Sequence, residues 1–140
     1  MRNQKSYNYN NNIPGGGLDF GFLKSNNHRE TTSDLPEILF ITSFPPRECG
    51  IATYSQDLII ALKNKFVNSF NISICALESD NEKHSYQEKI KFKLNTDQPG
   101  AFAILAKEIN QDKNIAMVMV QHEFGFYVKR EFEFQQFMVA

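Results

Sequence analysis

The fold is decided by the stretch SFPPRECGIATYSQDL at residues 43–58. Before it, the run from Glu37 to Thr42 is short and mostly apolar, which predicts a buried strand. Pro45 and Pro46 lack the N–H group that a central strand donates, so the strand must end before them. After them, mainly apolar side chains recur at three- and four-residue spacing, which predicts a helix. These side chains are Ile51, Tyr54, Leu58 and Leu62.

The loop between this strand and this helix has the features of an anion site. Gly50 has no Cβ, so a ligand or a neighbouring backbone can approach it closely. The first N–H groups of a helix have no partner within the helix, and the helix dipole is positive at that end, which favours a phosphate. The pattern therefore predicts a nucleotide or sugar-phosphate pocket. An ordinary turn between a strand and a helix is the alternative, because a single glycine is a weak fingerprint.

Strands and helices alternate along the rest of the chain. The first strand is expected at 35–44 and the first helix at 52–66. Thr53 and Gln56 have the spacing of a capping box, which places the start of this helix at Thr53 rather than at Gly50. Periodicity and turn residues predict the remaining elements. They are strands at 70–77, 89–94 and 115–120, a helix that begins at Pro99, and a helical segment at 130–140.

This order of elements predicts an α/β fold with an open, parallel, Rossmann-like sheet. The common strand order 3-2-1-4 sets the first strand beside the fourth, and ligands bind at the carboxyl ends of the strands there. The loops at this position are Pro45–Gly50 and His122–Gly125. The apolar run Ile115–Val120 predicts a central strand covered on both faces. The three alternating lysines of the strand at 89–94 are expected to protect a strand near the sheet edge, with a basic patch as the alternative.

Residues 1–34 differ from the rest of the chain. They are rich in asparagine and contain the triplet Gly15-Gly16-Gly17. With so few periodic apolar residues, this segment is predicted to be a flexible tail, which leaves a partial domain at 35–140. Phe20, Phe22 and Leu23 are the residues with which the tail could dock locally. The glycine triplet is interpreted as a linker rather than a phosphate loop, because no strand precedes it and no helix follows.

Composition excludes several classes of function. The chain has 140 residues and a formal net charge of −1, from 15 Lys+Arg against 16 Asp+Glu, which argues against nucleic acid as the partner. No apolar run is long enough to cross a membrane, and the N-terminus lacks the apolar core of a secretory signal. Two cysteines, Cys49 and Cys75, are too few for a disulfide framework or a cysteine-rich zinc site, so a reducing cytoplasmic compartment is expected.

Two stretches resemble bacterial family-4 glycosyltransferases of the GT-B fold. Residues 39–58 are similar to the opening of the N-terminal domain of these enzymes. The run Val120–Phe126, with the sequence VQHEFGF, resembles the loop after their fourth strand, and the likeness extends over 37–130. It implies an enzyme of the cytoplasm or the inner membrane surface. Such an enzyme transfers a sugar, with retention, from a nucleotide-sugar donor to a sugar-containing acceptor, without a metal ion or another cofactor.

The resemblance assigns roles to residues of both loops. It places His122 beside the sugar-transfer centre, and we expect His122 to be the catalytic residue. In the second loop, Glu123 and Gly125 are expected to contact substrate. In the first loop and the helix start, substrate contacts are expected from Arg47, Glu48, Cys49, Gly50 and Ile51.

The chemistry of these residues, taken alone, leaves other interpretations open. Imidazole can donate, accept or carry charge, yet His122 would also suit a structural role at a strand end. Arg47 could hold a phosphate with two donors or be an exposed loop charge. Cys49 lies just before a helix start, where a thiolate is stabilised, which suggests a rival site with Cys49 as nucleophile and His122 as base. The close-set aromatic residues between 124 and 137 suit a core better than a sugar-stacking platform.

The chain also departs from the pattern of the family. GT-B enzymes have two Rossmann-like domains, and the C-terminal domain, which holds most donor contacts, is missing here. Val128 and Lys129 stand where a glycine pair is expected. We therefore expect a fragment that is inactive alone, because transfer needs donor and acceptor held together in a water-poor cleft. The alternative is a non-catalytic module that binds a nucleotide or a partner.

Overall fold

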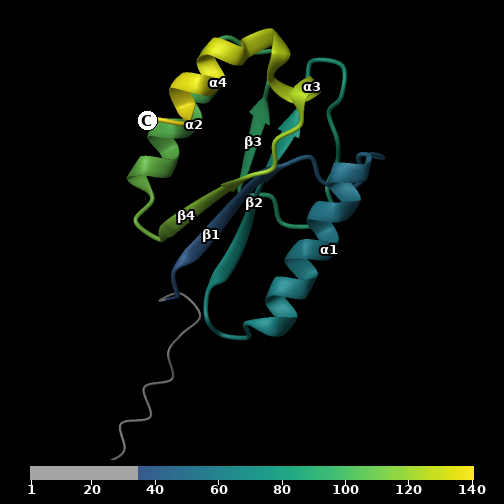
Figure 1. Ribbon diagram of the computed structural model, residues 1–140, viewed down its shortest axis with the longest axis vertical. Helices are drawn as coiled ribbons and strands as arrows, with labels where there is room; N and C mark the ends of the chain where they lie inside the picture. The colour runs from purple at the N-terminus through teal and green to yellow at the C-terminus, as the bar shows by residue number, and fades with distance from the viewer. Residues whose placement is uncertain (1–34) are drawn as a thin grey trace, which may run out of the picture.

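The computed structural model describes residues 35–140, with the side chain of Phe124 left out, so the predicted tail at 1–34 lies outside the described residues. Four strands and the helices between them follow one another along the chain (Figure 1). The strands are β1 (Glu37–Thr42), β2 (Asn71–Glu78), β3 (Phe92–Asn95) and β4 (Ile115–Val120). The helices are α1 (Gly50–Lys65), α2 (Ala101–Gln111), α3 (Phe124–Tyr127), a 3₁₀ turn at Val128–Arg130, and α4 (Glu131–Phe137).

The four strands form one open sheet in which every pair is parallel. The strand order is β3-β2-β1-β4, so the predicted order 3-2-1-4 and the α/β fold class are confirmed. Because each connection between parallel strands must cross over the sheet, the carboxyl ends of all four strands lie at one rim. This rim is where the sequence placed both candidate loops.

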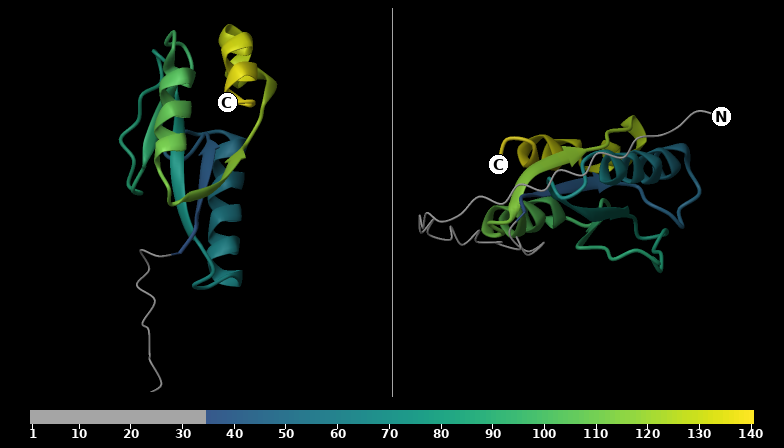
Figure 2. Two further views of the ribbon diagram at one scale, coloured as in Figure 1. Left: turned by 90° about the vertical axis from the view of Figure 1, so that its left-hand side faces the viewer. Right: turned by 90° about the horizontal axis from the view of Figure 1, so that it is seen from below.

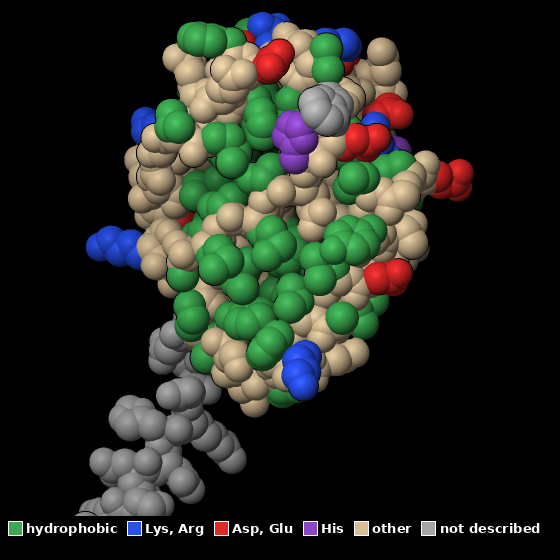
Figure 3. All heavy atoms as spheres, viewed as in Figure 1, with side chains coloured by type: hydrophobic (Ala, Val, Ile, Leu, Met, Phe, Trp, Pro, Cys, Tyr) green, Lys and Arg blue, Asp and Glu red, His purple; other side chains and the backbone are tan. Residues whose placement is uncertain are grey.

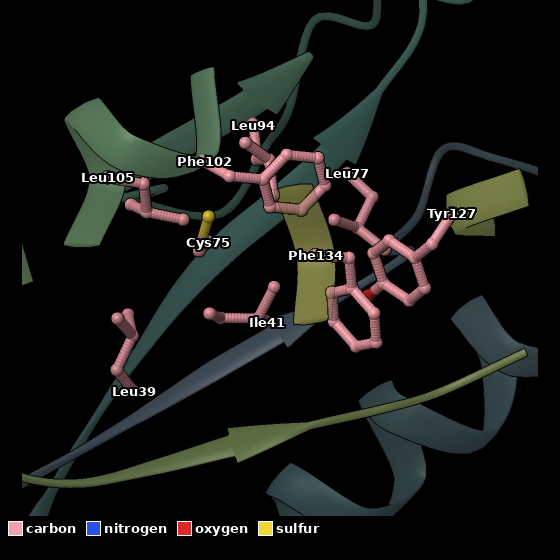
Figure 4. Close-up of a cluster of buried hydrophobic side chains, with 9 residues drawn as sticks. All are labelled: Leu39, Ile41, Cys75, Leu77, Leu94, Phe102, Leu105, Tyr127 and Phe134. Carbon is pink, nitrogen blue, oxygen red and sulfur yellow. The ribbon is translucent and has the colours of Figure 1, made fainter. Parts of the chain in front are cut away.

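Helices cover both faces of the sheet, with α1 on one side and α2 and α4 on the other (Figures 1 and 2). Under α1, the buried side chains are Phe40, Phe44, Ile59 and Ile74. On the other face, Phe102 and Leu105 of α2 pack with Tyr127 and Phe134 from the C-terminal helices against strand residues (Figure 4). Burial raises the pKa of the Cys75 thiol, which lies in this cluster, to about 12. Cys75 is therefore a core residue.

β4 is an edge strand, which corrects one prediction. The expected central strand, covered on both faces, pairs with β1 alone among the described strands. Met117 is 53% exposed and Val118 is 37% exposed. The apolar run gave the strand and its bounds, but burial depends on what lies beside a strand, and no described strand lies on the outer side of β4.

The start of α1 also differs from the prediction. The helix begins at Gly50, and its cap is Cys49, whose Sγ accepts a hydrogen bond from the Ala52 N–H at 3.4 Å. The capping box predicted from Thr53 and Gln56 is therefore wrong. Sulfur is a weak hydrogen-bond acceptor, so cysteine is not among the usual N-cap residues. The sequence therefore did not indicate that the helix begins after Cys49.

Charged partners surround β3, the other edge strand. The Lys91 ammonium lies 2.7 Å from the Asp112 carboxylate and also pairs with Glu37, and Lys93 pairs with Glu78 at 3.1 Å. These contacts agree with charges on an edge strand rather than a basic patch. β3 begins at Phe92, three residues later than predicted, although the Lys91 N–H already donates to the Ile74 carbonyl.

The segment after β4 is helical, as predicted, but only one side of it is buried. Phe134 lies in the core, whereas Phe132, another of the close-set aromatic residues, is 71% exposed. No helix among residues 35–140 has the length and apolar character to cross a bilayer.

Candidate functional site

The site lies where β1 and β4 end side by side. The Gln121 N–H donates to the Ile41 carbonyl at 2.9 Å, so pairing of the two strands continues to the rim. Beyond this point the chain enters the loop before α3, while β1 leads into the Pro45–Gly50 loop. The predicted neighbourhood of these two loops is therefore confirmed.

Arg47 connects the first loop with the second. The carbon of its guanidinium lies 5.2 Å from the centre of the Phe126 ring, within the range of a cation–π contact. Its Nη2 lies 2.8 Å from Oε2 of Glu82, in the segment after β2. The Arg47 N–H also donates to the Phe44 carbonyl at 3.2 Å, which closes the turn around the two prolines. The Arg47 guanidinium thus has two partners, Glu82 and Phe126, rather than being a free surface charge.

A pocket of about 170 Å³ opens beside Arg47. We call it the rim pocket. Its walls come from the loops that follow β1, β2 and β3 and from the segment around α3. The residues that line it are Arg47, Leu77, Ser79, Glu82, Thr96, Asp97, Gly125, Phe126 and Lys129. Of the predicted site residues, Arg47 and Gly125 are therefore brought together in one pocket.

Asp97 and Lys129 also line the rim pocket, as an ion pair. The Lys129 Nζ lies 2.8 Å from Oδ1 of Asp97, and the Asp80 N–H donates to Oδ2 of Asp97 at 3.2 Å. The hydrogen bond from Lys129, followed by that from the Asp80 backbone, holds the pKa of the Asp97 carboxyl below its ordinary value. Arg130 donates to the Asp97 carbonyl at 3.2 Å, so the β3 loop is tied to the 3₁₀ turn.

His122 is exposed and does not line the rim pocket. Its ring centre lies 5.5 Å from that of Tyr127 and 5.5 Å from that of Phe134. Those two rings stack on each other at 3.9 Å, as Figure 4 shows. The imidazole is therefore seated on an aromatic stack that belongs to the core. These ring contacts agree with a structural role for His122. They also hold the imidazole at a fixed place on the rim, as a catalytic role would require.

The remaining predicted residues of the first loop lie outside the rim pocket. Cys49 is the helix cap, and its Sγ lies 3.2 Å from Oγ of Ser43. Glu48 and Gly50 are exposed, and Ile51 is half-buried. A Cβ added at Gly50 would meet no atom within 4 Å, so open space lies before the helix start. In the second loop, Glu123 is exposed and away from the pocket lining.

Asp97, Thr96 and Lys129 are pocket residues that the sequence did not single out as site residues. A signal existed for the first two, because they follow β3 directly and the carboxyl ends of parallel strands meet at one rim. No signal existed for Lys129, whose pairing with Asp97 joins residues far apart in the chain.

Aromatic residues of this region divide between core and surface. Tyr127 and Phe134 are buried, as the core interpretation expected, while Phe126 is half-buried below Arg47. The Tyr127 hydroxyl is buried without a hydrogen-bond partner in the described part of the chain. Burial raises the pKa of Tyr127, so this phenol stays neutral. No group of three or more potential metal ligands occurs within residues 35–140.

Comparisons of the chain with protein-family models, with curated proteins and with solved structures found no match.

Proposed function

We propose that this chain supplies the acceptor side of a retaining sugar transferase that uses a nucleotide-sugar donor. One observation carries the proposal: the Arg47 guanidinium lies against the Phe126 ring, which joins the two stretches that resemble family-4 transferases. The pairing of β1 with β4 supports it, because this pairing brings both stretches to the carboxyl rim of the sheet.

The size of the rim pocket supports a role as one half of a larger cleft. Its volume of about 170 Å³ is below the roughly 300–1,000 Å³ of pockets that enclose a whole small-molecule ligand. Such a pocket suits one sugar ring or one phosphate, not a nucleotide sugar together with its acceptor. We therefore propose that a C-terminal domain completes the cleft and that the chain does not turn over alone.

The reaction requires groups that hold charge and hydroxyls in place. The bond between the anomeric carbon and a diphosphate oxygen of the donor breaks, a bond to an acceptor hydroxyl oxygen forms, and the hydroxyl proton leaves with the diphosphate. Arg47 presents a planar cation that can bind a phosphate or sugar hydroxyls. His122, exposed on the same rim, can exchange hydrogen bonds with substrate at the transfer centre.

The position of His122 outside the rim pocket favours one alternative function. Arg47 and Lys129 both line the pocket, each paired with a carboxylate of the same lining, so an anionic ligand could displace Glu82 or Asp97 from its cation without the imidazole. A non-catalytic module that binds an anionic ligand, such as a nucleotide, would need these cations and would not need His122.

Isothermal titration calorimetry with the whole chain separates the two functions. The probes are UDP, GDP, UDP-glucose, GDP-mannose and methyl glycosides. The transferase proposal expects weak binding of a glycoside, weakened at least tenfold (about 1.4 kcal/mol) in Arg47→Met. The matched control Lys65→Met, at the far end of α1, leaves binding unchanged. Binding of a nucleoside diphosphate without any glycoside binding would favour the module. Release of UDP from UDP-glucose, or of GDP from GDP-mannose, by the chain alone would contradict the proposal that the chain does not turn over alone.

A further inference from the structure

The rim pocket gathers charged side chains from separate segments of the chain. On the face of the molecule seen in Figure 3, most charged side chains lie toward the margins and the middle is hydrophobic. In the rim pocket, by contrast, two ion pairs line one space. Arg47 pairs with Glu82, and Lys129 pairs with Asp97, each at 2.8 Å. Two cations and two carboxylates leave this lining without net charge, so a charged ligand has to exchange with one of them.

Asp97 is the firmly held carboxylate of the lining. Besides the Lys129 ammonium, its carboxylate accepts the Asp80 N–H at 3.2 Å. The backbone of Asp97 is held as well, because its N–H donates to the Asn95 side chain at 3.0 Å and its carbonyl accepts from Arg130 at 3.2 Å. A ligand that took the place of this carboxylate would have to break contacts with several segments. Asp97 is therefore expected to stay when a ligand binds.

Glu82 is the weakly held carboxylate of the lining. In the described part of the chain, its side chain has one polar partner, Arg47. The backbone of Glu82 pairs with that of Ser79 in a tight turn, within the irregular segment between β2 and β3. The Glu82 side chain is 48% exposed, and an ion pair with so much exposure contributes little, because water screens it and both side chains lose freedom. Glu82 can therefore leave Arg47 at small cost.

Arg47 keeps its other contacts when Glu82 leaves. Its guanidinium carbon lies 5.2 Å from the centre of the Phe126 ring, and its backbone N–H donates to the Phe44 carbonyl at 3.2 Å. The guanidinium would then offer to a ligand the N–H donors that match a carboxylate or a phosphate. Without Glu82, the lining would also carry one net positive charge. The Glu82 carboxylate thus marks the position where an anionic group of a ligand fits.

We propose that the rim pocket takes a sugar that carries one anionic group, either a carboxylate or a phosphate, and that Glu82 competes with this group for Arg47. The Asp97–Lys129 pair stays intact and binds the ring hydroxyls, because a carboxylate accepts from hydroxyls and an ammonium has further N–H groups to donate. The inference rests on the proposed function, which supplies the sugar. The two ion pairs add the anionic group.

Size and charge favour an anionic sugar over other anions. The pocket of about 170 Å³ has room for one ring, whereas a nucleoside diphosphate is larger and brings more negative charge than a single free cation balances. Like charges placed together across a binding surface are unfavourable, so the fixed Asp97 carboxylate also disfavours a second anionic group. A bare phosphate would have no hydroxyls for the Asp97–Lys129 pair to bind.

Isothermal titration calorimetry of the whole chain compares matched sugars. The probes are glucose and mannose, each as the methyl glycoside, the uronate and the 6-phosphate, with inorganic phosphate as the bare anion. A hydrogen bond between two charged groups is stronger than one between a charged group and a hydroxyl. We therefore expect an anionic form to bind about tenfold more tightly than the neutral methyl glycoside of the same sugar, and more tightly than inorganic phosphate.

Glu82→Gln tests the competition directly, because it removes the charge and keeps the size of the side chain. Its affinity for the anionic sugar should rise roughly two- to fivefold, while its affinity for the neutral methyl glycoside stays the same. The control Glu88→Gln makes the same change in the same segment, outside the pocket lining, and should leave both affinities unchanged.

Four results would overturn the inference. Equal affinity for the neutral and anionic forms of a sugar would show that the pocket does not select an anionic group, and the proposed sugar transfer would stand. An affinity for the anionic sugar that does not rise in Glu82→Gln would show that Glu82 is no competitor. Inorganic phosphate that binds as tightly as a sugar 6-phosphate would show that the hydroxyls are not bound. Absence of binding by every sugar, neutral or anionic, would overturn the proposed function as well.

Discussion

Arg47 and Asp97 are charged residues of the rim pocket that are each held by an ion pair. Arg47 is fixed by Glu82 and by the face of Phe126, and Asp97 is fixed by Lys129. Each charge therefore has a partner from another loop. Ligand binding at this pocket would exchange one of these partners for a group of the ligand.

The Asp97–Lys129 pair makes stability depend on pH in a defined direction. The pKa of Asp97 is lowered in the folded chain, so its contribution is present above the ordinary value of about 3.9 and is lost as pH falls through the folded value. We expect Asp97→Asn to be less stable than the native chain at pH 6, with the difference shrinking below pH about 4. Urea midpoints from pH 6 to 3 measure this. A difference in urea midpoint between Asp97→Asn and the native chain that stays constant from pH 6 to pH 3 would contradict this account.

The two charged pairs show what sequence could not predict at this scale. Arg47 was singled out because it lies in the first loop, but its partners Glu82 and Phe126 come from two other segments. Lys129 was noted only as a departure from a glycine pair. Pairs between distant segments depend on the fold as a whole, so local pattern carries no signal for them.

The start of α1 shows how an element can begin at an unusual cap. Cys49 Sγ accepts the Ala52 N–H, and one turn later the hydroxyls of Ser55 and Thr42 meet at 2.6 Å and fix α1 to the end of β1. Both hydroxyls are fully buried. The helix start is thus held to the sheet by hydrogen bonds from two successive turns.

Substitution of the two cysteines should have opposite effects on stability. Cys49→Ser replaces a weak sulfur acceptor with a strong oxygen cap, so we expect stability to hold or rise by a few tenths of a kcal/mol, while Cys49→Ala loses about 0.5–1 kcal/mol. Cys75→Ser places a hydroxyl in an apolar core and should cost about 1–3 kcal/mol. Urea unfolding of the three variants measures this order. A stable Cys75→Ser or a destabilised Cys49→Ser would contradict it.

β4 shows which part of an element the sequence determines. The apolar run Ile115–Val120 predicted the strand with its observed bounds, because side-chain type favours the extended backbone. Its burial was predicted wrongly, because an unalternating run indicates that both faces are to be covered but not which segment covers them.

At the scale of the whole molecule, the alternation of strands and helices was sufficient to predict the sheet order and the rim at which the loops meet. That part of the site followed from topology. The lining of the rim pocket did not follow from topology, because the pocket also includes residues at the ends of β2 and β3. His122 packs against Phe134 and does not belong to this lining. The position of a side chain on a rim is set by packing, which strand order does not encode.

The central claim is that the loops after β1 and β4 form one ligand site. Its most direct test is an NMR titration of the ¹⁵N-labelled chain with a methyl glycoside that binds in the calorimetric screen. The account predicts that amides at 47–50 and at 122–129 shift together and fit one dissociation constant, while amides at the opposite end of α1, around Lys65, stay unchanged. Shifts confined to one loop, or two loops that fit different dissociation constants, would contradict it.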